Sequence, residues 1–295
     1  MKFIFRKTIW MAAVALLGVM SSCEREYLEK DPTNAASEEL SMSSLANIEI
    51  ALNGLHRNMY YRQNASQGQN GATSVLTYME VMGDDLVFPT TGNGWYVSTL
   101  RWLDNNNANS GNLFYPYDFY YGQIRIANII LKNLPNVSGA DATKERIKGE
   151  ALAMRAYGYF MLTQIYAKRY EVGGANTHPG VPLRLDDSFD PIPRSTVAEV
   201  YTSINSDLAQ SYTLLDGKPR SNKSHFNSNV VRGLMARVAL VQGKYPESAT
   251  YAKEARTGFA LMTNAQYKSG FNSYAVSEWM WGYSPIDLTS DYFGN

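Results

Sequence analysis

Apolar residues recur at spacings of three and four along most of the chain after residue 43, which predicts a protein built mainly from helices. The first stripe runs to about Tyr61 and contains Leu45, Ile48, Leu52, Leu55 and Met59. A polar stretch from residue 63 to 71 interrupts the pattern. Further helices are predicted at about residues 117–134, 142–169, 195–215, 229–242 and 246–258.

The predicted helix at 142–169 has two apolar stripes. One contains Ile147, Ala151, Met154, Gly158, Met161 and Ile165, and the other contains Leu152, Ala156, Tyr159, Thr163 and Tyr166. Two stripes indicate burial on two sides, as for a helix inside a layered stack. Arg155 lies between the stripes, and we expect it to have a structural role, paired with Glu150 or a loop carbonyl.

The last two predicted helices resemble a tetratricopeptide hairpin. Gly243 occupies the turn, where glycine can adopt the positive φ that other residues avoid. Small residues on the two helices would allow close approach: Gly233, Ala236 and Ala239 on the first, and Ala249, Ala252 and Ala255 on the second. Ser248 and Arg232 depart from the repeat pattern, so a generic helical hairpin is the alternative.

Residues 87–112 are rich in Gly, Asn, Thr and Pro and have no helical period, which predicts a long loop. Long loops in compact domains are commonly functional. The chain contains 21 Tyr and 5 Trp, and both residue types combine a flat apolar face with a polar edge. The candidate ligand contacts are Trp95, Tyr96 and Trp102, with Asp84 and Asn93. The alternative is that these aromatic rings fill the gap between the loop and the helices.

The composition and motifs of the sequence argue against nucleic-acid binding, metal binding and catalysis. Lys plus Arg and Asp plus Glu both number 27, which gives no electrostatic reason to expect nucleic acid. His56, His178 and His225 are scattered without metal-ligand spacing, and we predict no metal and no cofactor. The sequence has no nucleophile elbow or phosphate loop. The acid pairs that begin at Asp84 and Asp186 have the composition of a glycosidase site, but adjacent residues usually point apart. We therefore predict that the chain is not an enzyme.

The N-terminus has the three parts of a secretory signal. Basic residues at positions 2, 6 and 7 precede an uncharged, mostly apolar run from Ile9 to Met20, and Ser21 and Ser22 lead to Cys23. The run is shorter than the roughly 20 residues that a spanning helix needs. Residues 19–23 (VMSSC) resemble a lipobox, and Cys23 is the only cysteine, so no internal disulfide is possible. We predict a signal peptide at 1–22, lipidation of Cys23, an acidic tether at 23–42 and a helical domain at 43–295.

Four segments resemble the SusD/RagB family of outer-membrane nutrient-binding lipoproteins. They are the acidic start after Cys23 that ends at Asp31-Pro32, the helix segment GEALAMRAYGYF at 149–160, the connector from Gly180-Val181-Pro182-Leu183 to Pro193-Arg194-Ser195-Thr196, and residues 236–240 with the turn and helix at 243–255. They occur in the family's order.

This resemblance implies a mostly α, tetratricopeptide-like helical-repeat stack with long irregular loops. It implies a non-enzymatic, cell-surface lipoprotein of the outer membrane that binds oligosaccharides and passes them to a SusC-like TonB-dependent transporter. Trp95 is the preferred glycan contact. Residues 278–282 (EWMWG) resemble a strand that enters a C-terminal region, and we expect part of that region to be missing from the chain. The alternative function is a protein-binding scaffold without sugar binding.

Overall fold

The computed structural model describes residues 38–64, 66, 68–88, 94–271 and 273–283. The signal segment, Cys23, most of the tether and Asn93 lie outside these residues. The chain divides into two units, residues 1–43 and 44–295. The described residues of the first unit contain α2 (Glu38–Ser41), a single helical turn in the segment predicted as tether.

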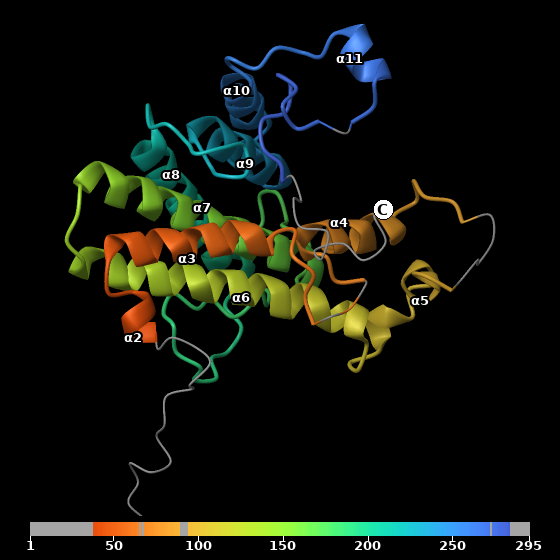
Figure 1. Cartoon of the computed structure of the whole chain (residues 1–295). Helices are drawn as coiled ribbons and strands as arrows, with labels where there is room; N and C mark the ends of the chain where they lie inside the picture. Colours follow the sequence, from red (N-terminus) through yellow and green to blue (C-terminus); the bar gives the residue numbers. More distant parts are fainter. Residues whose placement is uncertain (1–37, 65, 67, 89–93, 272, 284–295) are drawn as a thin grey trace, which may run out of the picture. The chain divides into compact units, whose positions relative to one another are not determined.

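Helices make up the second unit, and its described residues contain isolated β-bridges but no strand. This confirms the mostly α fold. The long helices are α3 (Leu45–Asn58), α4 (Gly71–Val81), α6 (Gly111–Asn133), α7 (Asp141–Tyr166), α8 (Val197–Leu215), α9 (Ser228–Val241) and α10 (Tyr245–Ala255). Short turns of helix are α5 (Val97–Leu100), η2 (Asp104–Asn106), η3 (Leu134–Asn136) and α11 (Asn264–Lys268). Helices that follow one another pack together: α6 on α7, α7 on α8, α8 on α9 and α9 on α10, while α3 lies along α6 and α7 (Figure 1).

Helix α7 is the centre of the stack. Every residue from Gly149 to Thr163 is buried, which confirms the two-sided burial predicted from its two stripes. Glycines allow neighbouring helices to approach closely. A Cβ at Gly149 would lie 2.7 Å from a Leu215 side-chain carbon of α8, and a Cβ at Gly158 would lie 2.9 Å from Ile124 of α6.

The structure corrects the expected partner of Arg155. Its guanidinium donates to both carboxylate oxygens of Asp207 on α8, at 2.7 and 2.8 Å, and to Oδ1 of Asn128 on α6 at 2.9 Å. Glu150 has other partners. The expected structural role remains, because the pair joins three helices across the centre of the stack.

Two helices differ from the sequence prediction. Helix α4 is not predicted at all; it begins at Gly71, whose φ of +56° and missing side chain let the turn lie against the Met59 carbonyl. Helix α6 begins at Gly111 rather than near Tyr117, because Ser110 caps it and Pro116 is accommodated inside it. The predicted loop at 87–112 is therefore shorter and contains α5 and η2.

The α9–α10 hairpin agrees with the repeat-like interpretation at its turn. Gly243 has a φ of +73°, and a Cβ there would clash with Val172. Arg232, which departs from the repeat pattern, packs its guanidinium 3.7 Å from the ring centroid of Tyr212 and 4.9 Å from that of Tyr251. Arg232 thus joins α9 to Tyr212 of α8 and Tyr251 of α10 by cation–π contacts.

The strand expected at residues 278–282 is wrong: this segment has no strand in the described part of the chain. Instead, the indole of Trp281 packs edge-on against Tyr157 with centroids 5.5 Å apart, and it also contacts Phe226. Its Nε1 donates to the Ser224 carbonyl at 3.1 Å. Aromatic packing rather than strand pairing holds this segment on the stack.

Many tyrosines fix loops to the helices. Their rings lie among the helices while their hydroxyls donate to loop or helix-end carbonyls: Tyr78 to Gly68, Tyr115 to Gly71, Tyr121 to Pro182, Tyr159 to Arg184 and Tyr166 to Leu113. Each buried hydroxyl gains a partner and each connector gains an attachment point. The high tyrosine content therefore reflects the architecture as well as any ligand surface.

Candidate functional site

A buried carboxylate organises the segment that contains the candidate aromatic residues. The hydroxyls of Thr99 and Ser110 donate to Asp104 at 2.7 and 2.8 Å, and Ser98 Oγ and Asn112 Nδ2 donate at 3.1 Å. Burial favours the neutral acid, but these four hydrogen bonds outweigh it and lower the pKa of Asp104. Asp104 therefore joins α5, η2 and the start of α6. The sequence pattern gave no signal for this role, because the partners lie on α5 and at the start of α6 without a periodic spacing.

The aromatic residues on either side of α5 have an unusual backbone conformation. Tyr96 and Trp102 both have a φ of +58°, the left-handed region that bulky residues avoid. Such conformations cost roughly 1–3 kcal/mol each and cluster at binding sites. The Asp104 hydrogen bonds supply the surrounding constraint that maintains them.

Trp95 and Tyr96 lie on one hollow of the surface. The hollow has a volume of about 680 Å³, and its wall is mostly polar, including Gln69, Ser98 and Asn112. The Trp95 side chain is 45% exposed, and its ring centroid lies 5.8 Å from that of Tyr96. Burial raises the pKa of Tyr96, so its hydroxyl remains protonated at neutral pH. We call this hollow the Trp95 pocket.

Trp102 and Asp84 are not among the described residues that line this pocket. The Trp102 side chain is 58% exposed, so it does not fill a gap between the loop and the helices. Asp84 is exposed on the turn after α4. Asn93 lies outside the described residues. Among the predicted ligand contacts that the structure describes, it therefore brings together Trp95 and Tyr96.

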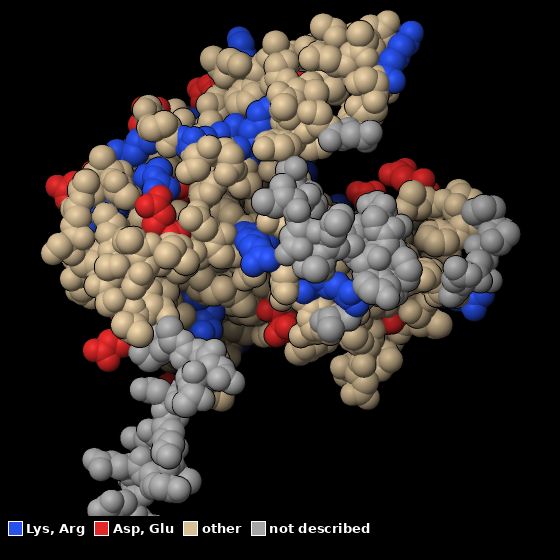
Figure 2. All heavy atoms as spheres, in the orientation of Figure 1, with Lys and Arg blue, Asp and Glu red and all other residues tan. Residues whose placement is uncertain are grey.

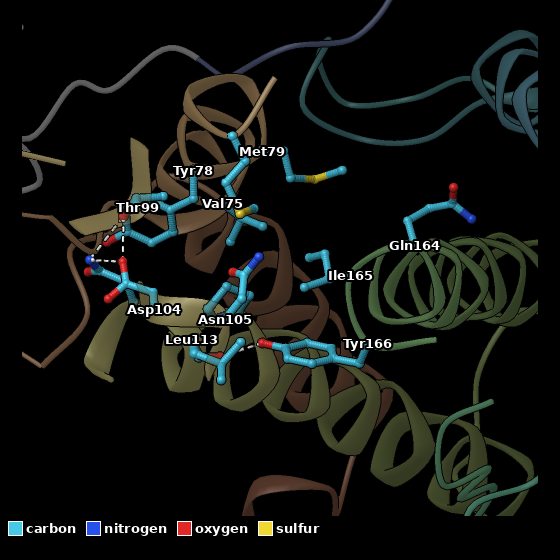
Figure 3. Close-up of a pocket in the computed structure, with 13 residues that line it drawn as sticks. Val75, Tyr78, Met79, Thr99, Asp104, Asn105, Leu113, Gln164, Ile165 and Tyr166 are labelled. Carbon is cyan, nitrogen blue, oxygen red and sulfur yellow. Dashed lines mark hydrogen bonds between the residues drawn. The ribbon is translucent and has the colours of Figure 1, made fainter. Parts of the chain in front are cut away.

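A second cavity of about 490 Å³ lies between α4, the start of α6 and the end of α7 (Figure 3). It shares Tyr78 and Asn112 with the Trp95 pocket. Its wall includes Met79 and Met82 of α4 and Ile165 of α7. No sequence motif indicated it, since α4 itself is not predicted.

A third feature is a buried carboxylate with two histidines. Glu150 Oε2 lies 2.8 Å from His56 Nε2 and 2.8 Å from His225 Nδ1, and Arg146 Nη1 donates to Glu150 Oε1 at 2.9 Å. Burial favours the neutral acid, but the hydrogen bonds from His225 and His56 lower the pKa of Glu150 far below its usual range. Burial also lowers the pKa of His56 despite its bond to Glu150. Two histidines that are scattered in the sequence thus meet in the fold.

His56, Glu150 and His225 have the composition of a metal site. A histidine that binds a metal through Nε2 usually donates its Nδ1–H to an acceptor. Nδ1 of His56 is buried and has no hydrogen-bond partner in the described part of the chain. The opposite tautomer places the proton on Nε2, toward Glu150, and leaves Nδ1 as a bare acceptor. The geometry therefore fits a carboxylate held by two imidazoles and an arginine better than a metal centre.

Charges on the face in Figure 2 are mixed, with basic and acidic side chains interspersed among a larger neutral surface. This agrees with the equal numbers of acidic and basic residues. Among the described residues, no helix is long and apolar enough to cross a membrane.

The profile of a family described as "Starch-binding associating with outer membrane" matches residues 26–240. The match covers most of the chain, and the chain belongs to this SusD-like family. No curated protein has significant similarity to it.

Solved structures of SusD-like proteins share the fold. A SusD-like carbohydrate-binding protein from Bacteroides vulgatus is 25% identical, with a TM-score of 0.73 over 83% of this chain and 51% of its own. A SusD superfamily protein from Bacteroides thetaiotaomicron is 23% identical, with a TM-score of 0.69 over 84% of this chain and 54% of its own. One from Bacteroides fragilis is 23% identical, with a TM-score of 0.60 over 74% of this chain and 51% of its own. The chain thus spans about half the length of these structures.

Proposed function

We propose that the chain captures oligosaccharides in the Trp95 pocket. The observation that carries this proposal is a half-exposed indole beside a polar hollow. Sugar rings present C–H patches that stack on Trp and Tyr faces, while amide and hydroxyl groups bind the sugar hydroxyls. Trp95 and Tyr96 supply the faces, and Gln69, Ser98 and Asn112 supply the polar groups. Membership of a family described as starch-binding supports the same ligand class.

The proposal includes a location and a partner. Cys23 is the lipidation site that fixes the chain to the outer membrane, with the helical domain on the cell surface. The bound sugar then passes to a SusC-like TonB-dependent transporter. The family description, which includes association with the outer membrane, supports the location. Two or more acyl chains, at about 0.8 kcal/mol for each buried CH₂, hold a protein stably on a bilayer.

Sugar binding is tested with the purified chain by isothermal titration against a panel of neutral oligosaccharides, including gluco-, xylo- and manno-oligosaccharides. Trp95→Ala should weaken binding at least tenfold. Trp102→Ala is the matched control, because it removes an equally large exposed indole outside the pocket. Equal losses in both variants would contradict the pocket assignment, and no binding to any glycan would overturn the function. Release of reducing sugar would contradict the prediction that the chain is not an enzyme.

Location and partner are tested in the producing cell. Cys23→Ser should abolish labelling by a palmitate analogue and move the chain out of the membrane fraction. The unmutated chain should co-purify from detergent extracts with a TonB-dependent transporter. Recovery of unlabelled, unmutated chain from the cytosol would overturn the location.

The protein-binding scaffold is the second candidate, and one surface favours it. An apolar groove of about 500 Å³ runs between α9 and α10, and Leu234, Leu240, Ala252 and Trp281 contribute to its wall. Leu240→Glu places a charge in this groove without touching the Trp95 pocket. The scaffold function predicts that Leu240→Glu abolishes co-purification of a partner while glycans fail to bind. The sugar-binding function predicts unchanged glycan affinity in the same variant.

A further inference from the structure

The cavity in Figure 3 shares wall residues with the Trp95 pocket but has a more apolar wall. Tyr78 and Asn112 belong to both walls. Ser98, on the Trp95 pocket, and Thr99, on the cavity, are adjacent in α5 and donate to the same Asp104 oxygen. The two hollows therefore adjoin each other at these residues.

Most polar side chains at the cavity wall are already engaged within the protein; Asn105, an exposed residue of η2, is the exception among the described lining residues. Thr99 and Asn112 donate to Asp104, Gln164 Nε2 donates to the Tyr201 hydroxyl at 2.7 Å, and the Tyr166 hydroxyl donates to the Leu113 carbonyl at 2.5 Å. What these groups leave for a ligand is largely apolar surface. The apolar contributors are Val75, Met79, Met82, Leu113, Pro116 and Ile165.

The size and composition of the cavity indicate what it accepts. A volume of about 490 Å³ falls within the range of small-molecule sites, and it exceeds what one methyl group would need. Met79 and Met82 add flexible thioethers, which adapt to irregular apolar groups and contact aromatic rings favourably. A sugar ring is a poor occupant, because most of its hydroxyls would lose water while Asn105 alone among the polar lining side chains lacks a partner within the described protein.

We propose that this cavity receives an apolar substituent of aryl size carried by the oligosaccharide in the Trp95 pocket. The natural ligand is then a decorated glycan, with its sugar on Trp95 and its substituent between α4 and α7. The inference rests on the proposed sugar-binding function and adds the class of substituent to it. Burying an apolar ring removes a large area from water, which stabilises the complex in proportion to that area.

The test compares matched probes that differ only in the substituent. Gluco-, xylo- and manno-oligosaccharides, each with and without a 4-methylumbelliferyl group at the reducing end, are titrated into the purified chain. At least one pair should show tenfold or greater preference for the substituted sugar. Equal affinities within every pair would overturn the inference and leave sugar binding intact. Failure of all probes to bind would overturn both.

Variants locate the preference in the cavity. Met79→Glu places a charge on its wall and should reduce the preference to less than twofold while the unsubstituted sugar binds as before. Met79→Leu keeps an apolar side chain of similar volume and should retain the preference. Met82→Glu repeats the test from the next turn, and thermal melts show that each variant is folded. A preference that survives both Glu substitutions would overturn the assignment to this cavity.

Discussion

Arg155 and Asp207 form a bidentate ion pair across the interface of α7 and α8, with N–O distances of 2.7 and 2.8 Å. Both side chains are nearly buried, and Asn128 of α6 accepts a further hydrogen bond from the same guanidinium. Breaking such a pair by removing one partner leaves a charge in the core without compensation. We expect Asp207→Leu to lower the free energy of unfolding by about 3–5 kcal/mol, measured by urea denaturation.

Two comparisons show whether this loss comes from the orphaned charge. The double variant Arg155→Met with Asp207→Leu removes both charges and should recover part of the loss. Lys218→Met disrupts the more exposed pair of Lys218 with Glu145, and it should change stability by no more than about 1 kcal/mol. A double variant no more stable than Asp207→Leu alone would contradict the explanation.

Close helix packing at Gly149 gives a second prediction. A Cβ at this position would lie within 3 Å of two side-chain carbons of Leu215. We expect Gly149→Val to lower the free energy of unfolding by at least 1–3 kcal/mol, roughly the cost of overpacking a core. Gly122→Ala is the control on α6, because a Cβ there has no neighbour within 4 Å. It should leave stability unchanged or raise it by up to about 1 kcal/mol, since alanine favours helices.

The periodic part of the fold was predictable from the sequence, and the site was predictable only in part. The stripes of α7 and the turn at Gly243 depend on local spacing, so they could be read directly. Helix α4 could not, because its start depends on Gly71 lying against Met59 at the end of another helix. Trp95 and Tyr96 follow from composition and loop character.

The interactions that hold the site and the Glu150 cluster follow no helical or strand period. Asp104 and its four donors come from α5, η2 and α6, and no spacing rule joins them. His56 and His225 meet at Glu150 only after α3 and the connector before α9 have packed on α7. For the same reason, the sequence pointed to Glu150 or a loop carbonyl as the partner of Arg155, whereas packing places Arg155 on Asp207.

Asp104 yields a third prediction that separates local from global stability. Asp104→Ala leaves the donors of Ser98, Thr99, Ser110 and Asn112 without their shared acceptor, which costs about 1–3 kcal/mol. We expect this variant to lose local stability in residues 94–112, which contain all four donors. Amide hydrogen exchange in residues 94–112 should become faster, while exchange in the middle of α7 should change little. The affinity for sugar should fall in the same variant. Equal increases in both regions would show that Asp104 stabilises the whole stack instead.

The Glu150 cluster gives the last prediction, on pH. Glu150 has a lowered pKa in the folded chain, so its contribution to stability is present above the ordinary glutamate pKa and is lost as pH falls below it. His56 also has a lowered pKa, because burial favours its neutral form. The unfolded chain therefore takes up a proton at His56 first, and stability starts to fall as pH drops through about 6.5. His225, Arg146 and the more distant Arg220 also face the carboxylate.

The measurement is the melting temperature from pH 8 down to about pH 2, which spans both the histidine and the glutamate ranges. The unmutated chain should lose stability in two stages, first near the ordinary histidine pKa and then near the ordinary glutamate pKa. Glu150→Gln should be less stable at pH 8 and should lose much of the second stage, because a glutamine has no proton to gain. Glu80→Gln, an exposed residue of α4, should keep the profile of the unmutated chain. If Glu150→Gln retained the full acid slope, the carboxylate would not be the group that links folding to pH.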